Sequence, residues 1–308
     1  MFSFAGCGSK KETKIPVIGI SQYGEHASLD NCREGFLQGL KEAGLEENKD
    51  FTIDYQNASF DNSTATQIAQ NFSSKNVALM CAIATPSATA CYAAAEDKDI
   101  PVVFNAITDP KQANLTEGNI TGVSDKLPVD PQLELIRKLQ PNAKTIGIIY
   151  TTSEPNSVSA IAEYKEKAGK YGFEIVDIGV ADQASVTQAA DTLINKKVDC
   201  ITNLTDNNVV GVLPSILEKT NAAKIPVYGS EIEQVINGCV ASEGIEYTEL
   251  GRQTGRMAAR VLRGESAEDI PYETISNSYL YVNPDALAAY GLTVPAELSE
   301  RAIDVTAE

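Results

Sequence analysis

The chain has 308 residues and a formal net charge of −17, from 42 acidic and 25 basic side chains. Its length allows two domains of about 150 residues each, and a hydrophobic content of 43% is ordinary for a globular protein. Such a negative surface repels phosphate backbones and anionic lipid head groups, which argues against binding to nucleic acid or to bulk membrane. No stretch approaches the roughly 18 consecutive apolar residues of a membrane-spanning helix.

The first half of the chain predicts alternating strands and helices. Strands are expected at 15–20, 51–55, 77–84 and 101–104, with helices starting near Ser28, Asn62 and Pro86. Gly35 and Gly39 are expected to let the first helix pack close to the sheet. The almost wholly apolar run at 77–84 indicates a strand buried on both faces, which is typical of a parallel sheet.

The second half repeats this rhythm. Its expected strands are at 145–150, 174–178, 199–202 and 225–228, and its helices at 130–139, 157–169, 185–194 and 209–220. Two such arrays predict an α/β fold of two doubly wound lobes with parallel sheets. Residues 122–128 are expected to cross between the lobes. A strand at 239–243, a long helix at 247–262, a strand at 279–282 and a helix at 284–290 follow.

The N-terminus carries a possible processing signal. Cys7 follows Ala5 and Gly6, and a polar tether continues to residue 14. This is similar to the end of a bacterial lipoprotein signal, whose cysteine becomes acylated, although the usual apolar segment is missing. A chance tetrapeptide before a disordered tail is the alternative. Most of the other five cysteines lie in apolar strand or helix patterns, and none has metal-ligand spacing, so we expect neither a metal site nor an essential disulfide.

Known catalytic motifs are missing from the sequence. It contains neither of the phosphate-binding motifs G-x-G-x-x-G and G-x-x-x-x-G-K-[ST]. The nucleophile motif G-x-S-x-G is also absent. A catalytic triad would have to use His26, which is the only histidine. The sequence therefore favours a non-enzymatic protein without a cofactor.

The loops after the predicted strands are rich in polar side chains. In the first half these are Gln22, His26, Thr85, Ser87, Asn105, Thr108 and Asp109, and in the second Glu154, Asn156, Ser157, Asp206, Asn207, Ser230 and Glu231. Because the carboxyl ends of parallel strands meet at one edge, these loops are expected to surround a ligand. Each also has a simpler explanation. Ser87, Ser157 and Asp206 could cap helices, residues 108–110 could be a turn, and His26 could be solvated.

Six ordered blocks resemble one family. They are 22–30 (QYGEHASLD), 82–86 (AIATP), 103–110 (VFNAITDP), 119–125 (NITGVSD), 148–150 with 154–157 (IIY and EPNS), and 206–207 (DN). The chain from Ile15 to Pro295 resembles the substrate-binding lipoproteins of ABC transporters, in the tryptophan/tyrosine-binding group related to the leucine/isoleucine/valine-binding class.

This resemblance implies a type I periplasmic binding protein, with two lobes joined by three crossings that close on a ligand. Crossings near Val123, Glu243 and Ser278 would divide the chain into a tether (1–14), lobe 1 (15–122 and 246–277) and lobe 2 (123–245 and 278–308). The resemblance also implies an extracytoplasmic monomer, held to the membrane through a lipid on Cys7, with an ABC permease and its ATPase as partners.

The implied ligand is a hydrophobic or aromatic amino acid such as tryptophan, tyrosine, phenylalanine or leucine. Thr85 and Ser87 would hold its carboxylate, and Asp206, or else Glu154 or Glu231, its ammonium. Tyr23 would stack on an aromatic side chain. The other polar residues would complete the shell.

Three alternatives remain open. A sugar or nucleoside receptor of the same fold would usually sandwich a ring between aromatic residues, in which these loops are poor. A two-lobed racemase would need paired cysteines across the cleft, whereas Cys81 and Cys91 lie inside a strand and a helix. A sugar-repressor type of regulator would need a DNA-binding module before Ile15.

Overall fold

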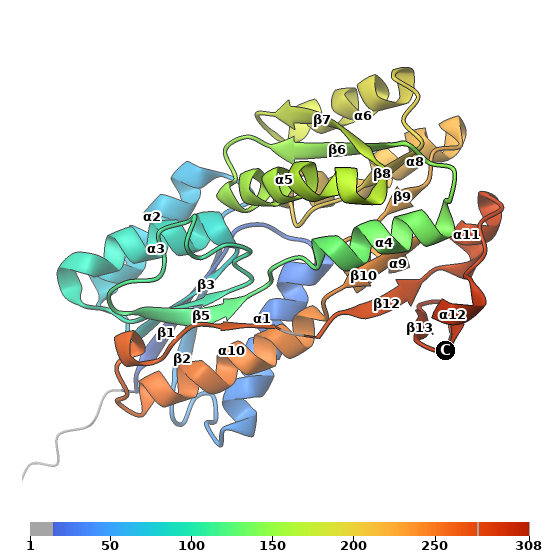
Figure 1. The fold of residues 1–308 in the computed structure, drawn as a ribbon. Helices are drawn as coiled ribbons and strands as arrows, with labels where there is room; N and C mark the ends of the chain where they lie inside the picture. Colours follow the sequence, from blue (N-terminus) through green and yellow to red (C-terminus); the bar gives the residue numbers. More distant parts are fainter. Residues whose placement is uncertain (1–14, 276, 308) are drawn as a thin grey trace, which may run out of the picture.

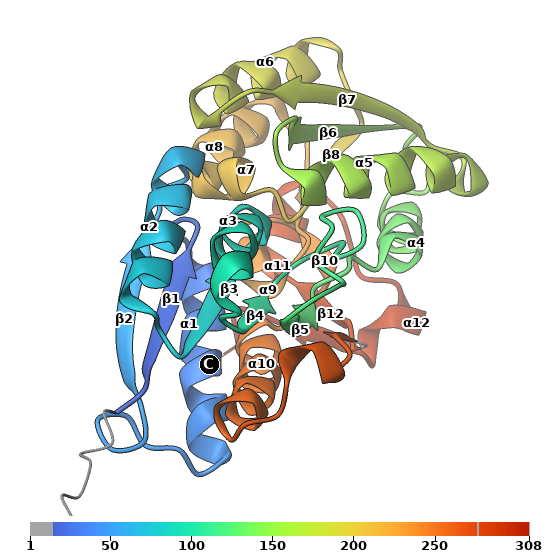
Figure 2. The same cartoon turned by 90° about the vertical axis from the view of Figure 1, so that its left-hand side faces the viewer.

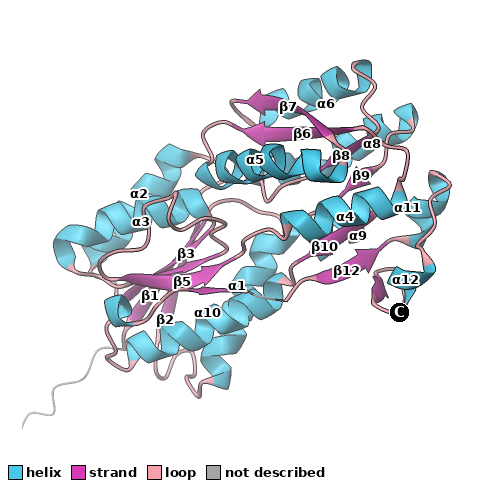
Figure 3. Cartoon of the chain, viewed as in Figure 1, coloured by secondary structure: helices cyan, strands magenta, loops and turns pink. Residues whose placement is uncertain are grey.

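The computed structural model describes residues 15–275 and 277–307 and has two α/β lobes side by side (Figure 1). The predictions for Cys7 and the tether fall outside the described residues. Helices cover the sheets of both lobes (Figure 3).

Lobe 1 is built on a six-stranded parallel sheet in the order β11-β5-β4-β3-β1-β2. Its strands are β1 (Val17–Gln22), β2 (Thr52–Asn57), β3 (Leu79–Ile83), β4 (Val102–Asn105), β5 (Ile120–Ser124) and β11 (Glu273–Thr274). One face packs on α2 (Asn62–Lys75) and α3 (Thr85–Ala95), the other on α1 (Ala27–Glu42) and α10 (Tyr247–Leu262) (Figure 2). The 3₁₀ turns η1 (Glu96–Lys98) and η4 (Ala267–Asp269) complete the lobe.

Glycines bring α1 and α10 into direct backbone contact. A Cβ atom on Gly35 would lie 2.1 Å from the carbonyl oxygen of Thr248, and one on Gly251 would lie 2.3 Å from that of Cys32. Gly35 was expected to let α1 pack close to the sheet. That expectation was wrong, because Gly35 lets α1 pack closely against α10 instead. The contact places the start of α10 beside the start of α1, where both helices reach the cleft.

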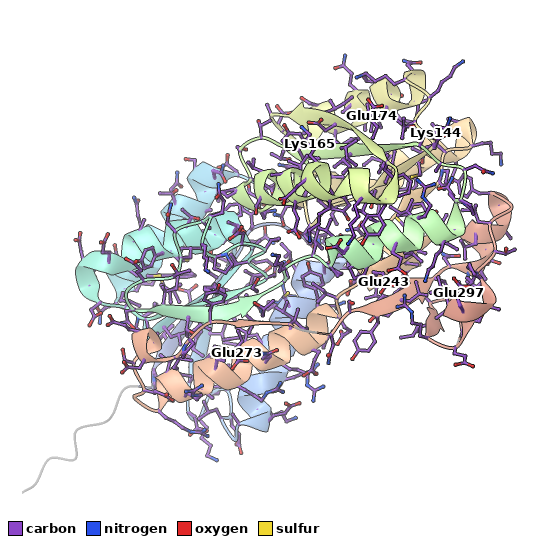
Figure 4. The ribbon with its side chains drawn as sticks, in the orientation of Figure 1. Lys144, Lys165, Glu174, Glu243, Glu273 and Glu297 are labelled. Atoms are coloured by element: carbon purple, nitrogen blue, oxygen red, sulfur yellow. The ribbon has the colours of Figure 1, made fainter. Side chains whose placement is uncertain are left out.

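Lobe 2 contains a four-stranded parallel sheet in the order β7-β6-β8-β9. Its strands are β6 (Thr145–Thr151), β7 (Glu174–Val180), β8 (Cys200–Thr202) and β9 (Val227–Tyr228). Its helices are α4 (Val129–Leu139), α5 (Pro155–Lys167), α6 (Val186–Asn195), α7 (Asn207–Gly211), α8 (Leu213–Ala223) and α9 (Ile232–Ile236), with 3₁₀ turns η2 (Ala168–Tyr171) and η3 (Gln183–Ser185). Figure 4 shows Lys165 on α5 and Glu174 at the start of β7.

The helix predicted at 209–220 is two helices. Val212 leaves the helical conformation at φ −123° and ψ 18°, and α8 then starts with Pro214 in its first turn. Proline has no N–H to continue the preceding helix, so the break follows from the sequence. The short helix α7 places Asn207 at its first position, next to the cleft.

A small third sheet lies where the chain passes between the lobes. It contains β10 (Ala241–Gly244), β12 (Tyr279–Val282) and β13 (Ala302–Asp304), with β10 antiparallel to β12. The short helices α11 (Pro284–Ala289) and α12 (Ala296–Ser299) belong to the same region. Arg301 pairs with the buried carboxylate of Glu243, which lies on the side that carries the C-terminal segment (Figure 4).

The buried hydrophobic residues form separate cores in the two lobes. Val123 and Ile245 pack in the core of lobe 1, whereas Leu127 and Ala241 belong to lobe 2. Val123 also pairs with Asn105 in the first sheet, so the predicted crossing at Val123 is in fact the strand β5. We propose the predicted division of the chain, with the first crossing moved to the residues after Ser124.

Candidate ligand-binding site

Each lobe turns the switch point of its sheet toward the other lobe. In lobe 1 the strand order reverses between β1 and β3, and in lobe 2 it reverses between β6 and β8. Helices diverge on either side of such a point and leave a crevice at the carboxyl ends of the strands. The loops after these four strands therefore meet between the lobes.

A small cavity lies at this meeting point, and the space in it that a water molecule can occupy is about 20 Å³. This is far below the roughly 300–1,000 Å³ usual for small-molecule pockets, so the lobes must move apart for the cavity to hold an amino acid. The cavity is lined by His26, Ser28, Leu29, Ala84, Thr85, Ala106, Thr108, Asp125, Asn156, Thr205, Asn207, Val210, Glu231 and Tyr247. Six of the predicted site residues are among them: His26, Thr85, Thr108, Asn156, Asn207 and Glu231.

Hydrogen bonds across the cleft hold the lobes closed. Ser28 donates to Glu231 at 2.5 Å and Asn31 donates to Glu233 at 2.6 Å. At the rim, Ser159 donates to Asp109 at 2.6 Å. Asp109 was predicted to contact the ligand, but it lies outside the cavity wall and joins the lobes instead.

Two carboxyl groups line the cavity. Asp125 accepts hydrogen bonds from Thr108 (2.9 Å) and Tyr247 (2.7 Å). Glu231 accepts from Ser28 and lines the same wall. Asp125, Glu231 and the three hydroxyl donors form what we call the carboxyl end.

Burial disfavours negative charge at the carboxyl end. Desolvation, together with the charges of Glu233 and Asp125, raises the pKa of Glu231 to about 8. Desolvation also raises the pKa of Asp125. Among the described residues that line the cavity there is no lysine or arginine to offset these groups. A cationic ligand group would supply the missing charge.

A second group of lining residues consists of His26, Asn156 and Asn207, and we call this group the amide end. Glu154 lies behind it and accepts hydrogen bonds from Asn156 (3.0 Å) and from the Asn207 side chain (2.7 Å). His26 Nε2 lies 3.5 Å from Asn207 Oδ1. Two side-chain atoms there, His26 Nδ1 and Asn156 Oδ1, are buried without a hydrogen-bond partner. Desolvation lowers the pKa of His26 to about 4, so its ring is neutral at pH 7.

The backbone along the lobe 1 wall is strained at two places. Ala84 and Ala106 adopt positive φ angles of 75° and 61°, and both line the cavity. Non-glycine residues rarely adopt such angles, and they persist where the surrounding structure holds them. Ala84 immediately precedes α3, whose first residue, Thr85, also lines the cavity. Free N–H groups at this helix end favour an anionic ligand group.

Asp206 does not occupy the place predicted for it. It caps α7, and it accepts four hydrogen bonds from its own lobe: from the N–H and hydroxyl of Thr151, the hydroxyl of Ser157 and the N–H of Val209. Its side chain is fully buried and does not line the cavity. Because Asp206 has four donors and lies outside the cavity wall, the geometry does not favour it as the partner of a ligand ammonium.

Other predicted residues support the wall from behind. Gln22 donates to Gly24 and Asp30, and the Tyr23 hydroxyl donates to the carbonyl of Phe60. Neither side chain lines the cavity.

The same holds for four more. Asn105 joins α1 to α10 by donating to Cys32 and accepting from Thr254. Ser87 accepts from Ser21, and Ser230 donates to Leu204. Ser157, also predicted to contact the ligand, donates to Asp206.

Sequence reasoning missed eight lining residues: Ser28, Leu29, Ala84, Ala106, Asp125, Thr205, Val210 and Tyr247. Asp125 follows directly on β5, the strand that was taken for a crossing. A correct assignment of β5 would have placed Asp125 in a strand-exit loop like the others. Tyr247 begins the long helix after the second crossing, and no local pattern singles it out.

The family model described as ABC transporter substrate-binding protein matches residues 17–306. The chain belongs to this family. It is 40% identical over 287 residues to the tyrosine-binding protein of Clostridioides difficile (strain R20291), covering 91% of this chain and 81% of that protein. As an ABC substrate-binding protein it acts in transport and outside the cytoplasm.

Two solved structures indicate the state of the cleft. An ABC domain of Streptococcus pneumoniae in complex with L-Trp is 33% identical, covers 94% of this chain and 100% of its own, and superposes with a TM-score of 0.90. A ligand-free, open substrate-binding protein of Clostridium difficile is 38% identical and covers 94% of this chain and 99% of its own. Its TM-score is nevertheless only 0.69. The open relative is the less similar in shape despite its higher identity. This agrees with the closed cleft seen here.

Within residues 15–275 and 277–307, no group of three or more histidine, cysteine, aspartate or glutamate side chains could hold a metal ion. In the same part of the chain, no helix is both long and apolar enough to cross a membrane.

Proposed function

We propose that this substrate-binding protein delivers an aromatic amino acid to an ABC importer. The carboxyl end carries the proposal, because a closed cavity with two carboxyl groups and no lysine or arginine in its described wall fits a ligand ammonium. The names of the relatives support the same class: one is called tyrosine-binding, and another was solved with L-Trp.

The cavity offers a partner for each part of an amino acid. Asp125 and Glu231 would hold the ammonium, so the role first predicted for Asp206 passes to Glu231, an alternative named above, and to Asp125. The start of α3, with Thr85, would hold the carboxylate. Leu29 and Val210 supply apolar wall for the side chain.

Two alternatives have less support. Among the described lining residues Tyr247 has the only phenol or phenyl ring, so no aromatic pair is present to sandwich a sugar or nucleobase. The cysteines at 32, 81, 91, 200 and 239 are buried, and none of them lines the cavity, as a racemase with a cysteine pair would require.

The cellular setting completes the proposal. The protein would work as a monomer, anchored through a lipid on Cys7, and would pass its ligand to a permease driven by an ATPase. Acyl chains contribute about 0.8 kcal/mol per buried CH₂ group, so more than one chain would be needed for a stable anchor.

A thermal-shift screen of the 20 amino acids with sugars and nucleosides tests the ligand class. A ligand at 100 times its dissociation constant stabilises the protein by about 2.7 kcal/mol. Aromatic amino acids should raise the melting temperature, and Glu231→Gln should abolish the shift. The proposal fails if a sugar or nucleoside raises the melting temperature and no amino acid does.

A further inference from the structure

We propose that His26 and Asn156 act together as a specificity element that requires a hydrogen-bond donor on the ligand side chain. This inference rests on the proposed function and narrows it. Among aromatic amino acids, a phenol or indole would be accepted, whereas phenylalanine would be rejected. The argument rests on which atoms at the amide end still lack a partner.

The hydrogen-bond network determines which nitrogen of His26 carries the proton. The side-chain nitrogen of Asn207 donates to Glu154 at 2.7 Å, so the atom of Asn207 that faces His26 is its oxygen, an acceptor. His26 Nε2, 3.5 Å from that oxygen, is then the protonated nitrogen. In the neutral ring, Nδ1 is left as an acceptor, and it is buried without a partner.

The same network fixes Asn156. Its side-chain nitrogen donates to Glu154 and to the backbone carbonyl of Thr205, both at 3.0 Å. Asn156 Oδ1 is therefore an acceptor, and it too is buried without a partner. Glu154 thus orients both amide side chains of the amide end by accepting their N–H groups, although it does not line the cavity itself.

Phe60 holds the imidazole ring in place from outside the cavity. The two rings are stacked at a centroid distance of 6.2 Å with an angle of 7° between their planes. Phe60 lies in the loop before α2, and His26 immediately precedes α1. The ring of His26 is therefore set by packing as well as by Asn207, so the proposed acceptor has a defined direction.

The two acceptors come from opposite lobes. His26 belongs to lobe 1 and Asn156 to lobe 2, and both line the one cavity. A single phenol O–H or indole N–H placed between them would donate to one acceptor. The other acceptor would then lie close to the edge of the same ring. Recognition of the side chain would then favour the closed form, because each lobe supplies part of the same contact.

A ligand without a donor leaves both acceptors unpaired after closure. Sites built to hydrogen-bond a substrate discriminate strongly against analogues that lack the group, because the buried polar atoms of the site lose their partner. We therefore expect tyrosine or tryptophan to bind at least about 100-fold more tightly than phenylalanine or leucine.

The test is titration calorimetry with tyrosine, tryptophan, phenylalanine and leucine on the full chain and on variants. His26→Phe removes the acceptor and keeps a ring beside Phe60, so it should reduce the preference for tyrosine or tryptophan over phenylalanine at least about 10-fold. Asn156→Leu should act in the same direction.

Asn31→Ala is the matched control. Asn31 donates across the cleft to Glu233 but does not line the cavity, so its loss should weaken all ligands alike and leave the preference unchanged. Thermal unfolding confirms that each variant is folded, and the comparison of ligands on the unaltered protein does not depend on any variant.

The outcomes separate the two proposals. If phenylalanine binds the unaltered protein as tightly as tyrosine and tryptophan, or if His26→Phe weakens all amino acids equally, the specificity element is wrong and the amino-acid receptor stands. If no amino acid binds at all, the proposed function itself is wrong.

Discussion

Two pairs of buried carboxyl groups lie near the cavity, and they differ in what surrounds them. Asp206 and Glu154 receive their hydrogen bonds from lobe 2 alone, and both are out of the cavity wall. Asp125 and Glu231 line the wall, and Glu231 receives a hydroxyl donor from the opposite lobe. The pKa of Glu154 is also raised to about 8, by desolvation and by the charge of Asp206, so a raised pKa alone does not distinguish the pairs.

The difference lies in the donors. A carboxylate whose oxygens are already occupied by backbone and side-chain donors organises a loop, as Asp206 does for the start of α7. One that faces a cavity with few donors can still take a ligand ammonium. The comparison predicts that substitution of Asp206 acts on stability and that substitutions at Asp125 or Glu231 act on binding.

The largest effect is expected from Glu231→Gln or Asp125→Asn. Each should weaken binding of the preferred amino acid by about 2 to 5 kcal/mol, because an ammonium buried on closure would lose a charged partner. Titration calorimetry measures this, with Glu174→Gln, at the exposed start of β7 and outside the cavity wall, as the control. An affinity within threefold of the unaltered protein at both positions would remove the carboxyl end from the site.

Asp206→Ala should act on stability. It removes the cap of α7 and leaves the Thr151 and Val209 N–H groups without their acceptor, so the free energy of unfolding should fall by about 2 to 4 kcal/mol. Urea denaturation measures this loss. If Asp206→Ala left the free energy of unfolding unchanged and abolished ligand binding, Asp206 would be the partner of the ammonium, as first predicted.

Protonation of Glu231 should make the open–closed equilibrium of the ligand-free protein depend on pH. In the closed form its pKa is raised to about 8, so the closed form holds the proton more tightly than an open form with an ordinary pKa near 4.5. Proton binding therefore favours closure fully below about pH 4.5, and this contribution is lost as the pH rises toward 8. We expect roughly 1 to 3 kcal/mol in the open–closed equilibrium.

Small-angle scattering of the ligand-free protein at pH 5 and pH 8.5 measures this effect as a smaller radius of gyration at the lower pH. Glu231→Gln, which cannot ionise, should give nearly the same radius at both values. Equal radii for the unaltered protein would mean that Glu231 does not couple closure to pH.

The smallest effect is expected at the rim. Ser159→Ala removes the hydrogen bond to Asp109, which joins the lobes at 2.6 Å without touching the cavity. One partly exposed hydrogen bond contributes about 0.5 to 1 kcal/mol, so all ligands should weaken two- to fivefold alike. A larger loss, or one that depends on the ligand, would place the rim within the binding site.

Much of the fold could be predicted from local patterns. Apolar runs ending in polar loops located β1, β3, β6 and β8, and the break at Pro214 could also have been read from the sequence. The strand β5 was missed because its residues, Ile120 to Ser124, are few and mixed in polarity. Its place in the sheet depends on pairing with β4 and β11, and β11 is more than 140 residues away.

The site was predicted less completely. His26, Thr85 and Asn156 were found because the ends of parallel strands share one edge, which is a rule of topology. Asp206 and Asn207 are neighbours in the sequence, yet Asp206 points to Thr151 and Ser157 while Asn207 lines the cavity. No pattern of residue types separates two adjacent polar residues at the start of a helix.

By itself the sequence determined the two α/β arrays, the loops that meet in the cleft and the resemblance to a family of transport receptors, because strand and helix periodicity and ordered motifs are local. Tertiary structure alone decided which carboxyl groups are free for a ligand. That choice depends on donors from distant residues: Thr151 and Ser157 occupy Asp206, whereas Ser28 donates to Glu231 from across the cleft.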